Sequence, residues 1–278
     1  MSKQRKIGVI IDSLKLGVKP GIQKAKELGA DGFQIWCTDG EMAPDNMTKA
    51  DRQAFKKYVA GLGLEISALC GDLLKGFLNA QTNKEILPRY KQFIDLATDL
   101  GVRIVTSHIG QLPDDERHPS WAIGLEALSE LGAYAVERGR VFGMETGPEE
   151  PIVLKRFLDK IGNKGVGVNY DPANLILYGP FDHIGGVTVL KDYIVHTHAK
   201  DGVRLMSRRS VTDPKQSKSL EVPLGDGSVA FKYYLKALDD IGYNGFLTIE
   251  REVGADPARD VAAAITFLRK IEVGSGKR

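Results

Sequence analysis

Short apolar runs recur along the chain, and each is followed by turn residues and then by a stretch of helical periodicity. The runs are continuously apolar rather than alternating, which is typical of parallel strands buried on both faces. Eight runs predict eight strands, namely Ile7–Ile11, Gly32–Trp36, Leu64–Leu69, Arg103–Ser107, Val141–Thr146, Gly165–Tyr170, Tyr193–His198 and Gly245–Glu250.

The stretches between the runs have the 3.6-residue period of amphipathic helices. After the third run, one apolar stripe comprises Ile86, Tyr90, Phe93, Ile94, Ala97 and Leu100. Several stretches end at a glycine before the next run, as helices often do: Gly29, Gly63, Gly101 and Gly242. The sixth helix, expected around Asp182–Lys191, has the weakest pattern. Eight strand–helix units predict an α/β fold, a (β/α)8 TIM barrel over residues 1–278 as a single domain, rather than an open doubly wound sheet.

The composition is that of a globular protein with little net charge. Of 278 residues, 42% are hydrophobic, and 38 basic residues against 36 acidic ones give a formal charge of +2. That balance excludes intrinsic disorder and gives no field that would attract nucleic acid or an anionic membrane. No apolar run approaches the ~18 residues of a membrane span, and the first run is too short for a signal peptide. We therefore expect a cytoplasmic protein.

The chemistry of a TIM barrel lies at the carboxyl ends of its strands, so the polar residues there are candidate site residues. They are Asp12, Cys37, Cys70 with Asp72, His108, Glu145, Asp171, His198 and Glu250. The last four close consecutive strands, which lie about 4.8 Å apart in a sheet. Three carboxylates at one mouth repel unless their pKa values rise or a cation neutralises them. Three oxygens and one imidazole favour a divalent metal site for Mn²⁺, Co²⁺ or Mg²⁺.

The histidines and cysteines have competing interpretations. His196 and His198 are two residues apart and share a strand face, so both point into the barrel, and His198 lies nearer the mouth. We therefore expect His198 to be the ligand and His196 to be a hydrogen-bonded core residue. His108 either binds a substrate oxygen or caps its strand. Cys37 and Cys70 form no CxxC pair, and we expect them to take no part in catalysis.

Several motifs together resemble the sugar phosphate isomerase/epimerase family. They are Met144–Thr146, Asn169–Asn174, His196–Asp201, Pro223–Gly227 and Thr248–Glu252, and the resemblance extends from Ile7 to about Ile271. This family comprises xylose-isomerase-like TIM barrels that include D-tagatose and D-psicose 3-epimerases and inosose-handling enzymes. The resemblance implies one metal ion held by Glu145, Asp171, His198 and Glu250. It also implies a substrate contact from Arg204, while Asn174 stands where those epimerases carry a histidine.

The function implied by the resemblance is proton transfer next to a carbonyl through an enediolate, with Glu145 and Glu250 as the acid–base pair. The expected cofactor is Mn²⁺, with Co²⁺, Mg²⁺ or Zn²⁺ as alternatives. The expected partner is a small sugar or sugar phosphate bound through His108, Asn174 and Arg204, with no nucleic acid and no membrane, and homo-oligomerisation is left open. The alternative activity is a metal-dependent lyase or dehydratase acting on a keto-sugar or inosose. A zinc-dependent apurinic endonuclease is disfavoured, because the chain has only five histidines.

The segment Asp201–Ser228 is long for a loop between a strand and its helix, and it is rich in Ser, Lys, Arg and Pro. It is either a surface insertion or a lid over the site. Arg204 follows His198 closely enough along the chain to reach a substrate hydroxyl or phosphate. We expect Met206–Ser219 to be mobile and Pro223–Gly227 to form a tight return to the helix.

Overall fold

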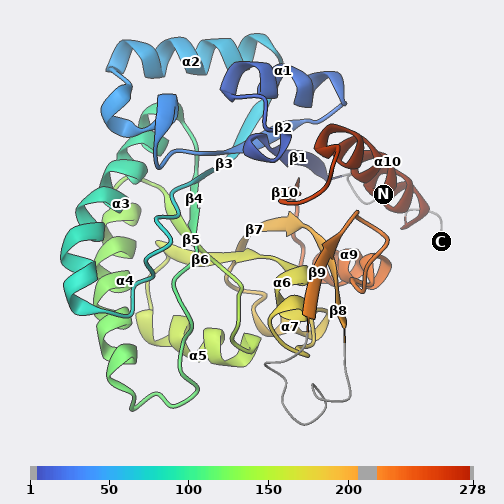
Figure 1. Ribbon diagram of the computed structural model, residues 1–278. Helices are drawn as coiled ribbons and strands as arrows, with labels where there is room; N and C mark the ends of the chain where they lie inside the picture. The colour runs from blue at the N-terminus through green and yellow to red at the C-terminus, as the bar shows by residue number, and fades with distance from the viewer. Residues whose placement is uncertain (1–4, 206–217, 276–278) are drawn as a thin grey trace.

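The computed structural model describes residues 5–205 and 218–275, and eight of its strands form a closed barrel surrounded by helices (Figure 1). The barrel strands are β1 (Lys6–Ile10), β2 (Gly32–Trp36), β3 (Glu65–Cys70), β4 (Ile104–Ser107), β5 (Val141–Glu145), β6 (Val166–Tyr170), β7 (Ile194–Ala199) and β10 (Phe246–Ile249). Neighbouring strands are all parallel, and β1 closes the barrel by pairing with β10. Each predicted run overlaps one of these strands, so the predicted TIM barrel is confirmed.

The helices lie outside the barrel and alternate with its strands (Figure 1). They are α1 (Val18–Glu27), α2 (Lys49–Gly61), α3 (Ala80–Leu100), α4 (Pro119–Glu137), α5 (Pro151–Ile161), α6 (Pro172–Leu177), α7 (Gly185–Val189), α9 (Phe231–Asp240) and α10 (Pro257–Ser275), with short 3₁₀ helices at Ile11–Leu14, Gly40–Met42 and Pro44–Asn46. Gly101 ends α3 in a left-handed conformation with φ of 76°, as predicted. The helix expected around Asp182–Lys191 is only the five-residue α7.

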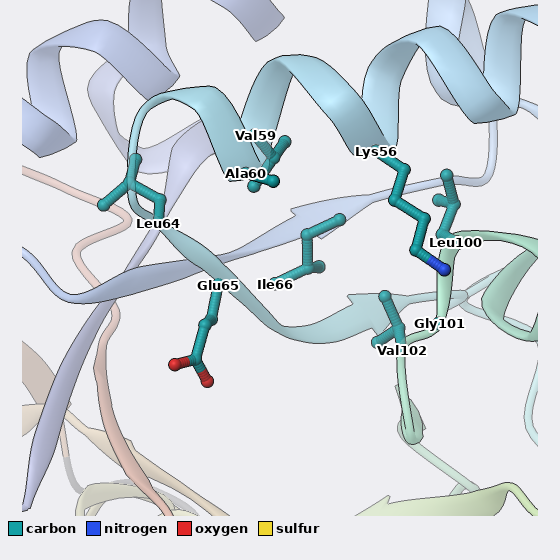
Figure 2. Close-up of a pocket in the computed structure, with 9 residues that line it drawn as sticks. All are labelled: Lys56, Val59, Ala60, Leu64, Glu65, Ile66, Leu100, Gly101 and Val102. Atoms are coloured by element: carbon teal, nitrogen blue, oxygen red, sulfur yellow. The ribbon is translucent and has the colours of Figure 1, made fainter.

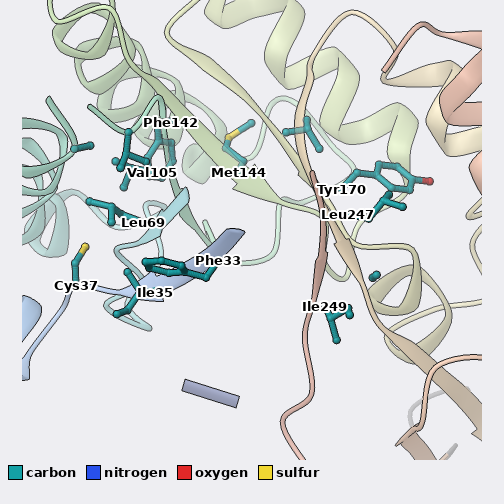
Figure 3. Close-up of a cluster of buried hydrophobic side chains, with 14 of the residues drawn as sticks. Phe33, Ile35, Cys37, Leu69, Val105, Phe142, Met144, Tyr170, Leu247 and Ile249 are labelled. Atoms are coloured by element: carbon teal, nitrogen blue, oxygen red, sulfur yellow. The ribbon is translucent and has the colours of Figure 1, made fainter. Parts of the chain in front are cut away.

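The two faces of the barrel strands differ in chemistry. The outward face is apolar and packs under the helices, and Figure 3 shows part of this cluster: Phe33, Ile35, Leu69, Val105, Phe142, Met144, Tyr170, Leu247 and Ile249. The inward face carries hydrogen-bonded polar side chains. Ser67 Oγ on β3 lies 3.3 Å from Thr248 Oγ1 on β10, across the interior, and Gln34 Nε2 donates to Thr106 Oγ1 at 3.3 Å. The predicted burial of both strand faces is therefore confirmed, but the inner face is polar, which the apolar runs did not reveal.

A two-stranded antiparallel sheet rises from the end of β7. Its strands are β8 (Asp201–Leu205) and β9 (Lys218–Val222). The buried Asp201 carboxylate accepts backbone N–H groups from four residues at 2.8–3.0 Å: Gly202, Gly225, Gly227 and Val229. This carboxylate fixes the return from β9 to α9, where Asp226 N donates to Pro223 O in the predicted turn. Most of Met206–Ser219, which we expected to be mobile, lies outside the described residues.

The cleft in Figure 2 lies at the end of the barrel opposite the predicted site. It has a volume of about 210 Å³, and its lining includes Leu64 to Ile66 and Gly101 to Val102, which lie at the amino ends of β3 and β4. Side chains at this end of a TIM barrel serve stability rather than catalysis. Among the described residues, no helix is long and apolar enough to cross a membrane.

Candidate metal centre

Four predicted ligands meet at the carboxyl end of the barrel. Glu145 ends β5, His198 lies near the end of β7, and Asp171 and Glu250 follow β6 and β10 directly. Each offers one ligand atom, and these atoms all lie within 4.8 Å of one another. The four strands are consecutive in the barrel, which is why residues more than 100 positions apart in the sequence converge.

His198 is the centre of this cluster and is fully buried. Its Nδ1 lies 3.2 Å from Glu250 Oε2, 3.4 Å from Glu145 Oε1 and 3.7 Å from Asp171 Oδ2. Its Nε2 lies 3.1 Å from Gln34 Oε1 and 3.1 Å from Asn169 Nδ2. In the neutral ring, a hydrogen on Nε2 directed at Gln34 places the lone pair of Nδ1 toward the carboxylates. A hydrogen bond on the second ring nitrogen is how proteins orient a metal-binding histidine.

Asp171 is held by the start of α6. As the N-cap residue, its Oδ1 accepts the N–H groups of Ala173 at 2.7 Å and Asn174 at 3.1 Å. Its backbone is fixed from β5, because Thr146 Oγ1 accepts from Asp171 N at 2.8 Å and donates to Asp171 O at 2.9 Å. Only Oδ2 is left, and it faces His198.

The cluster contains two buried atoms that have no hydrogen-bond partner among the described residues, Asp171 Oδ2 and His198 Nδ1. Burial raises the pKa of Asp171. Burial by itself would lower the pKa of His198, but Glu145 and Glu250 outweigh it and raise that pKa well above its usual value. Unpaired buried donor atoms beside crowded carboxylates are the arrangement that a divalent cation satisfies. These residues therefore fit a metal ion, with Glu145, Asp171, His198 and Glu250 as its ligands.

Two predicted substrate-binding residues, Asn174 and His108, lie against Glu145. Asn174 Nδ2 donates to Glu145 Oε1 at 3.0 Å and to Thr146 O at 3.1 Å, so this buried amide positions the carboxylate. His108 is 43% exposed, and its Nε2 lies 3.5 Å from Glu145 Oε1. The Glu145 charge, together with Asp72, raises the pKa of His108 to about 10. Substrate binding by Asn174 and His108 stays a prediction.

Lys200 is a site residue that the sequence analysis missed. It is buried, and its Nζ lies 3.1 Å from Glu250 Oε2 and 3.2 Å from Glu252 Oε1. Burial opposes its charge, but these carboxylates outweigh burial and raise the pKa of Lys200. Lys200 directly follows the last residue of β7, and this position at a strand end is the signal that could have identified it.

His196 has the structural role that we expected. Its Nδ1 lies 2.9 Å from Asn169 Oδ1 and its Nε2 lies 2.9 Å from Thr248 Oγ1, so both ring nitrogens are hydrogen-bonded inside the barrel. Asn169 extends this network to the cluster, since its Nδ2 donates to Glu145 Oε2 at 3.1 Å. The sequence analysis also missed Asn169 and Gln34 as supports of the cluster.

Arg204 lies on β8, opposite Ser219 of β9, and is half-buried. Two contacts hold the sheet that carries Arg204. Asp201, at the start of β8, accepts the N–H of Val229, and Arg251 Nη1 donates to Glu221 Oε1 of β9 at 2.6 Å. The ends of the segment Asp201–Ser228 are therefore ordered structure rather than a loose insertion. Contact of Arg204 with substrate and closure of the segment over the site stay predictions.

Comparisons with known proteins bear on the fold and the family of this chain. An inosose dehydratase from Geobacillus thermodenitrificans is 27% identical over 85% of this chain and 83% of its own length. The crystal structure of a xylose isomerase domain protein from Planctomyces limnophilus has a TM-score of 0.83 and 28% identity, covering 97% of this chain and 98% of that one. A D-tagatose 3-epimerase-like protein has the same fold, with a TM-score of 0.75 and 20% identity over 98% of this chain and all of its own. Residues 22–271 match the model of one family, and the chain therefore belongs to the xylose isomerase-like TIM barrel family.

Proposed function

We propose that this protein is a divalent-metal-dependent enzyme that removes a proton next to the carbonyl of a sugar or cyclitol. The cluster of Glu145, Asp171, His198 and Glu250, with two unpaired buried donor atoms, is the observation that carries this proposal. The proposed cofactor is one Mn²⁺ per chain. When bound, the cation supplies the positive charge that stabilises an enediolate.

Glu145 and Glu250 are the proposed proton-transfer groups. Both approach His198 Nδ1, at 3.4 and 3.2 Å, but their other neighbours differ. Glu145 is held by neutral amides and lies beside His108, whereas Glu250 is held by the Lys200 ammonium. Positioned carboxylates on either side of a substrate can remove a proton from one face of a carbon and return one to the other.

Two outcomes are open to the enediolate, and we favour loss of a neighbouring hydroxyl as water. The dehydratase relative matches most of this chain, and Asn174 replaces the histidine that the resembling ketose epimerases carry. The proposed substrate class is therefore an inosose or keto-sugar, with dehydratase activity. Epimerisation or isomerisation of a ketose, which the sequence analysis placed first, is the second candidate, since the shared fold also serves a D-tagatose 3-epimerase-like protein.

The test is metal analysis followed by proton exchange. We expect purified protein to retain about one metal ion per chain, and Asp171→Ala to lose it. Asp45→Asn is the matched control, because Asp45 is an exposed carboxylate paired with Arg89. Mn²⁺-loaded protein is then incubated in D₂O with keto-inositols and with ketohexoses such as D-tagatose.

Deuterium entering the substrate with loss of water supports the dehydratase, and deuterium entering with inversion supports the epimerase. Full metal retention by Asp171→Ala would show that the ligand set is wrong. Absence of exchange with every substrate in the panel would contradict the proposed reaction.

A further inference from the structure

His108 and Asp72 form a second pair of proton-carrying groups beside the metal cluster. Asp72 follows β3 and His108 follows β4, and the two residues meet because these strands are neighbours. His108 Nδ1 lies 2.6 Å from Asp72 Oδ2, and the same oxygen accepts the backbone N–H of His108 at 3.3 Å. This double contact fixes both the backbone and the ring of His108.

Asp72 is itself held in place. Its side chain is only 3% exposed, and its Oδ1 accepts the N–H of Leu74 at 2.7 Å. Leu74 has a φ of 57°, a left-handed conformation that a leucine rarely adopts. The contacts of this carboxylate thus go to His108 and to the turn that follows Asp72, so Asp72 fixes the imidazole relative to this turn.

The other ring nitrogen of His108, Nε2, faces Glu145. His108 Nε2 lies 3.5 Å from Glu145 Oε1, and the His108 side chain is 43% exposed at the open end of the barrel. A hydrogen on Nδ1, directed to Asp72, leaves Nε2 as the atom that exchanges protons with a bound molecule. An imidazole oriented by a buried carboxylate is a recurrent arrangement for acid–base catalysis.

We propose that the Asp72–His108 pair protonates the leaving hydroxyl in the dehydration, with His108 as a catalytic residue and Asp72 as a positioning residue. This inference rests on the proposed function. An epimerase returns a proton to the carbon that lost one, whereas a dehydratase needs an acid for the departing oxygen. His108 is the proposed acid, beside Glu145 as the base.

The step balances in protons and electrons. Glu145 takes the proton from the carbon next to the carbonyl, and the C–H electron pair gives the enediolate. As the carbonyl re-forms, the C–O bond on the adjacent carbon breaks, and its oxygen takes the proton from His108 Nε2 and leaves as water. Glu145 then returns its proton to His108 Nε2 across 3.5 Å, which restores both groups without an outside reactant.

The short distance between Glu145 and His108 also leads to an expectation about stereochemistry. We expect two groups 3.5 Å apart to act on one face of a substrate, so that the hydrogen and the hydroxyl leave from the same side. Among keto-inositol stereoisomers, only those with this hydrogen and hydroxyl on one face should lose water rapidly.

The experiment separates proton removal from loss of water. Mn²⁺-loaded parent, His108→Gln and Asp72→Asn are assayed with a keto-inositol in D₂O, following deuterium incorporation by NMR and dehydration by absorbance of the enone. Metal content and thermal stability are measured on the same samples. His118→Gln is the control, because His118 lies in the loop before α4 and caps that helix.

We expect His108→Gln to slow dehydration by about 10²–10⁴-fold while exchange, metal content and melting temperature stay near those of the parent. Asp72→Asn should slow dehydration by about 10–100-fold, because the imidazole loses its orienting partner. Dehydration at the parent rate in His108→Gln, or an equal loss of exchange and dehydration, would overturn the inference while leaving the proposed function standing. A parent that gives neither exchange nor dehydration would overturn both.

Discussion

Lys200 Nζ lies 3.1 Å from Glu250 Oε2, so a buried ammonium shares a carboxylate with the proposed metal. His198 Nδ1 lies 3.2 Å from the same oxygen. Lys200 thus supplies positive charge to a crowded group of acids whether or not a cation is bound. The loss of unfolding free energy on removing this charge should therefore differ between the metal-free and the metal-bound protein.

Lys200→Met tests this relationship, since methionine has similar length and no charge. Metal-free Lys200→Met should lose about 3–5 kcal/mol of unfolding free energy, because one partner of a buried ion pair has gone. Mn²⁺ should recover more stability in the variant than in the parent, because it then neutralises an additional carboxylate. Urea denaturation with EDTA and with Mn²⁺ measures both effects. Lys236→Met is the control, as its pair with Asp240 is exposed. An equal Mn²⁺ increment in parent and variant would contradict the argument.

The proton-transfer groups can be tested separately. Glu145→Gln should lower turnover by about 10²–10⁴-fold, because an amide cannot accept the substrate proton. Glu250→Gln should have an effect of this size on epimerisation, in which Glu250 is the second proton-transfer group. Loss of metal would add to this effect, so metal content is measured alongside. Glu252→Gln is the control for Glu250, since Glu252 also contacts Lys200 but is 60% exposed and does not belong to the cluster. Near-parent turnover in either glutamine variant would show that the replaced residue does not transfer a proton in the reaction.

The fold and the metal cluster could be predicted because their signals are local. An apolar run, a turn and a helical stripe are each visible in a short window, and eight repeats suffice for a barrel. The residue at which each apolar run stops also predicts where the strand ends. Glu145 and His198 could therefore be placed together without knowing any side-chain contact.

The remaining site residues depend on information that the runs do not contain. Gln34 and Asn169 interrupt apolar runs, and only the barrel register shows that both reach His198 or Glu145 from the inner face. Asp72 was recognised as a strand-end residue, but its pairing with His108 depends on the conformation of two loops. Such contacts are set by tertiary packing rather than by local pattern.

The two cysteines should be inert in the folded protein. Cys37 and Cys70 are buried, Cys37 Sγ donates to Cys70 O at 3.3 Å, and burial raises the pKa of both thiols. A thiol that stays protonated is a poor nucleophile. Replacing both by serine should therefore leave turnover near that of the parent, and iodoacetamide should label them only after unfolding. Labelling of the native protein with loss of activity would instead indicate a reactive thiol at the site.

Glu149 gives the chain a pH-dependent stability that is separate from the metal cluster. It lies in the loop between β5 and α5, is 4% exposed, and its Oε2 has no hydrogen-bond partner among the described residues. Burial raises the pKa of Glu149 to about 7 from an ordinary value of 4.5. The folded state therefore binds a proton more tightly than the unfolded chain does. The contribution of Glu149 to stability is therefore largest below about pH 4.5, falls as the pH rises from about 4.5 to 7, and levels off above 7, where the folded protein also ionises this carboxyl.

Glu149→Gln removes this cost, because a neutral amide does not ionise. The folded and unfolded pKa values of Glu149 differ by about 2.5. Because a difference of one pKa unit corresponds to about 1.4 kcal/mol, the full effect on the free energy of unfolding is roughly 3 kcal/mol. Between pH 5.5 and pH 8.5 the variant should gain about 2 kcal/mol of unfolding free energy relative to the parent. Urea denaturation of both proteins in EDTA at the two pH values measures this difference without contribution from bound metal. Glu150→Gln, at the exposed neighbouring position, is the matched control. A constant difference between parent and Glu149→Gln across this range would show that Glu149 is ionised throughout, because nearby backbone N–H groups then lower its pKa as much as burial raises it.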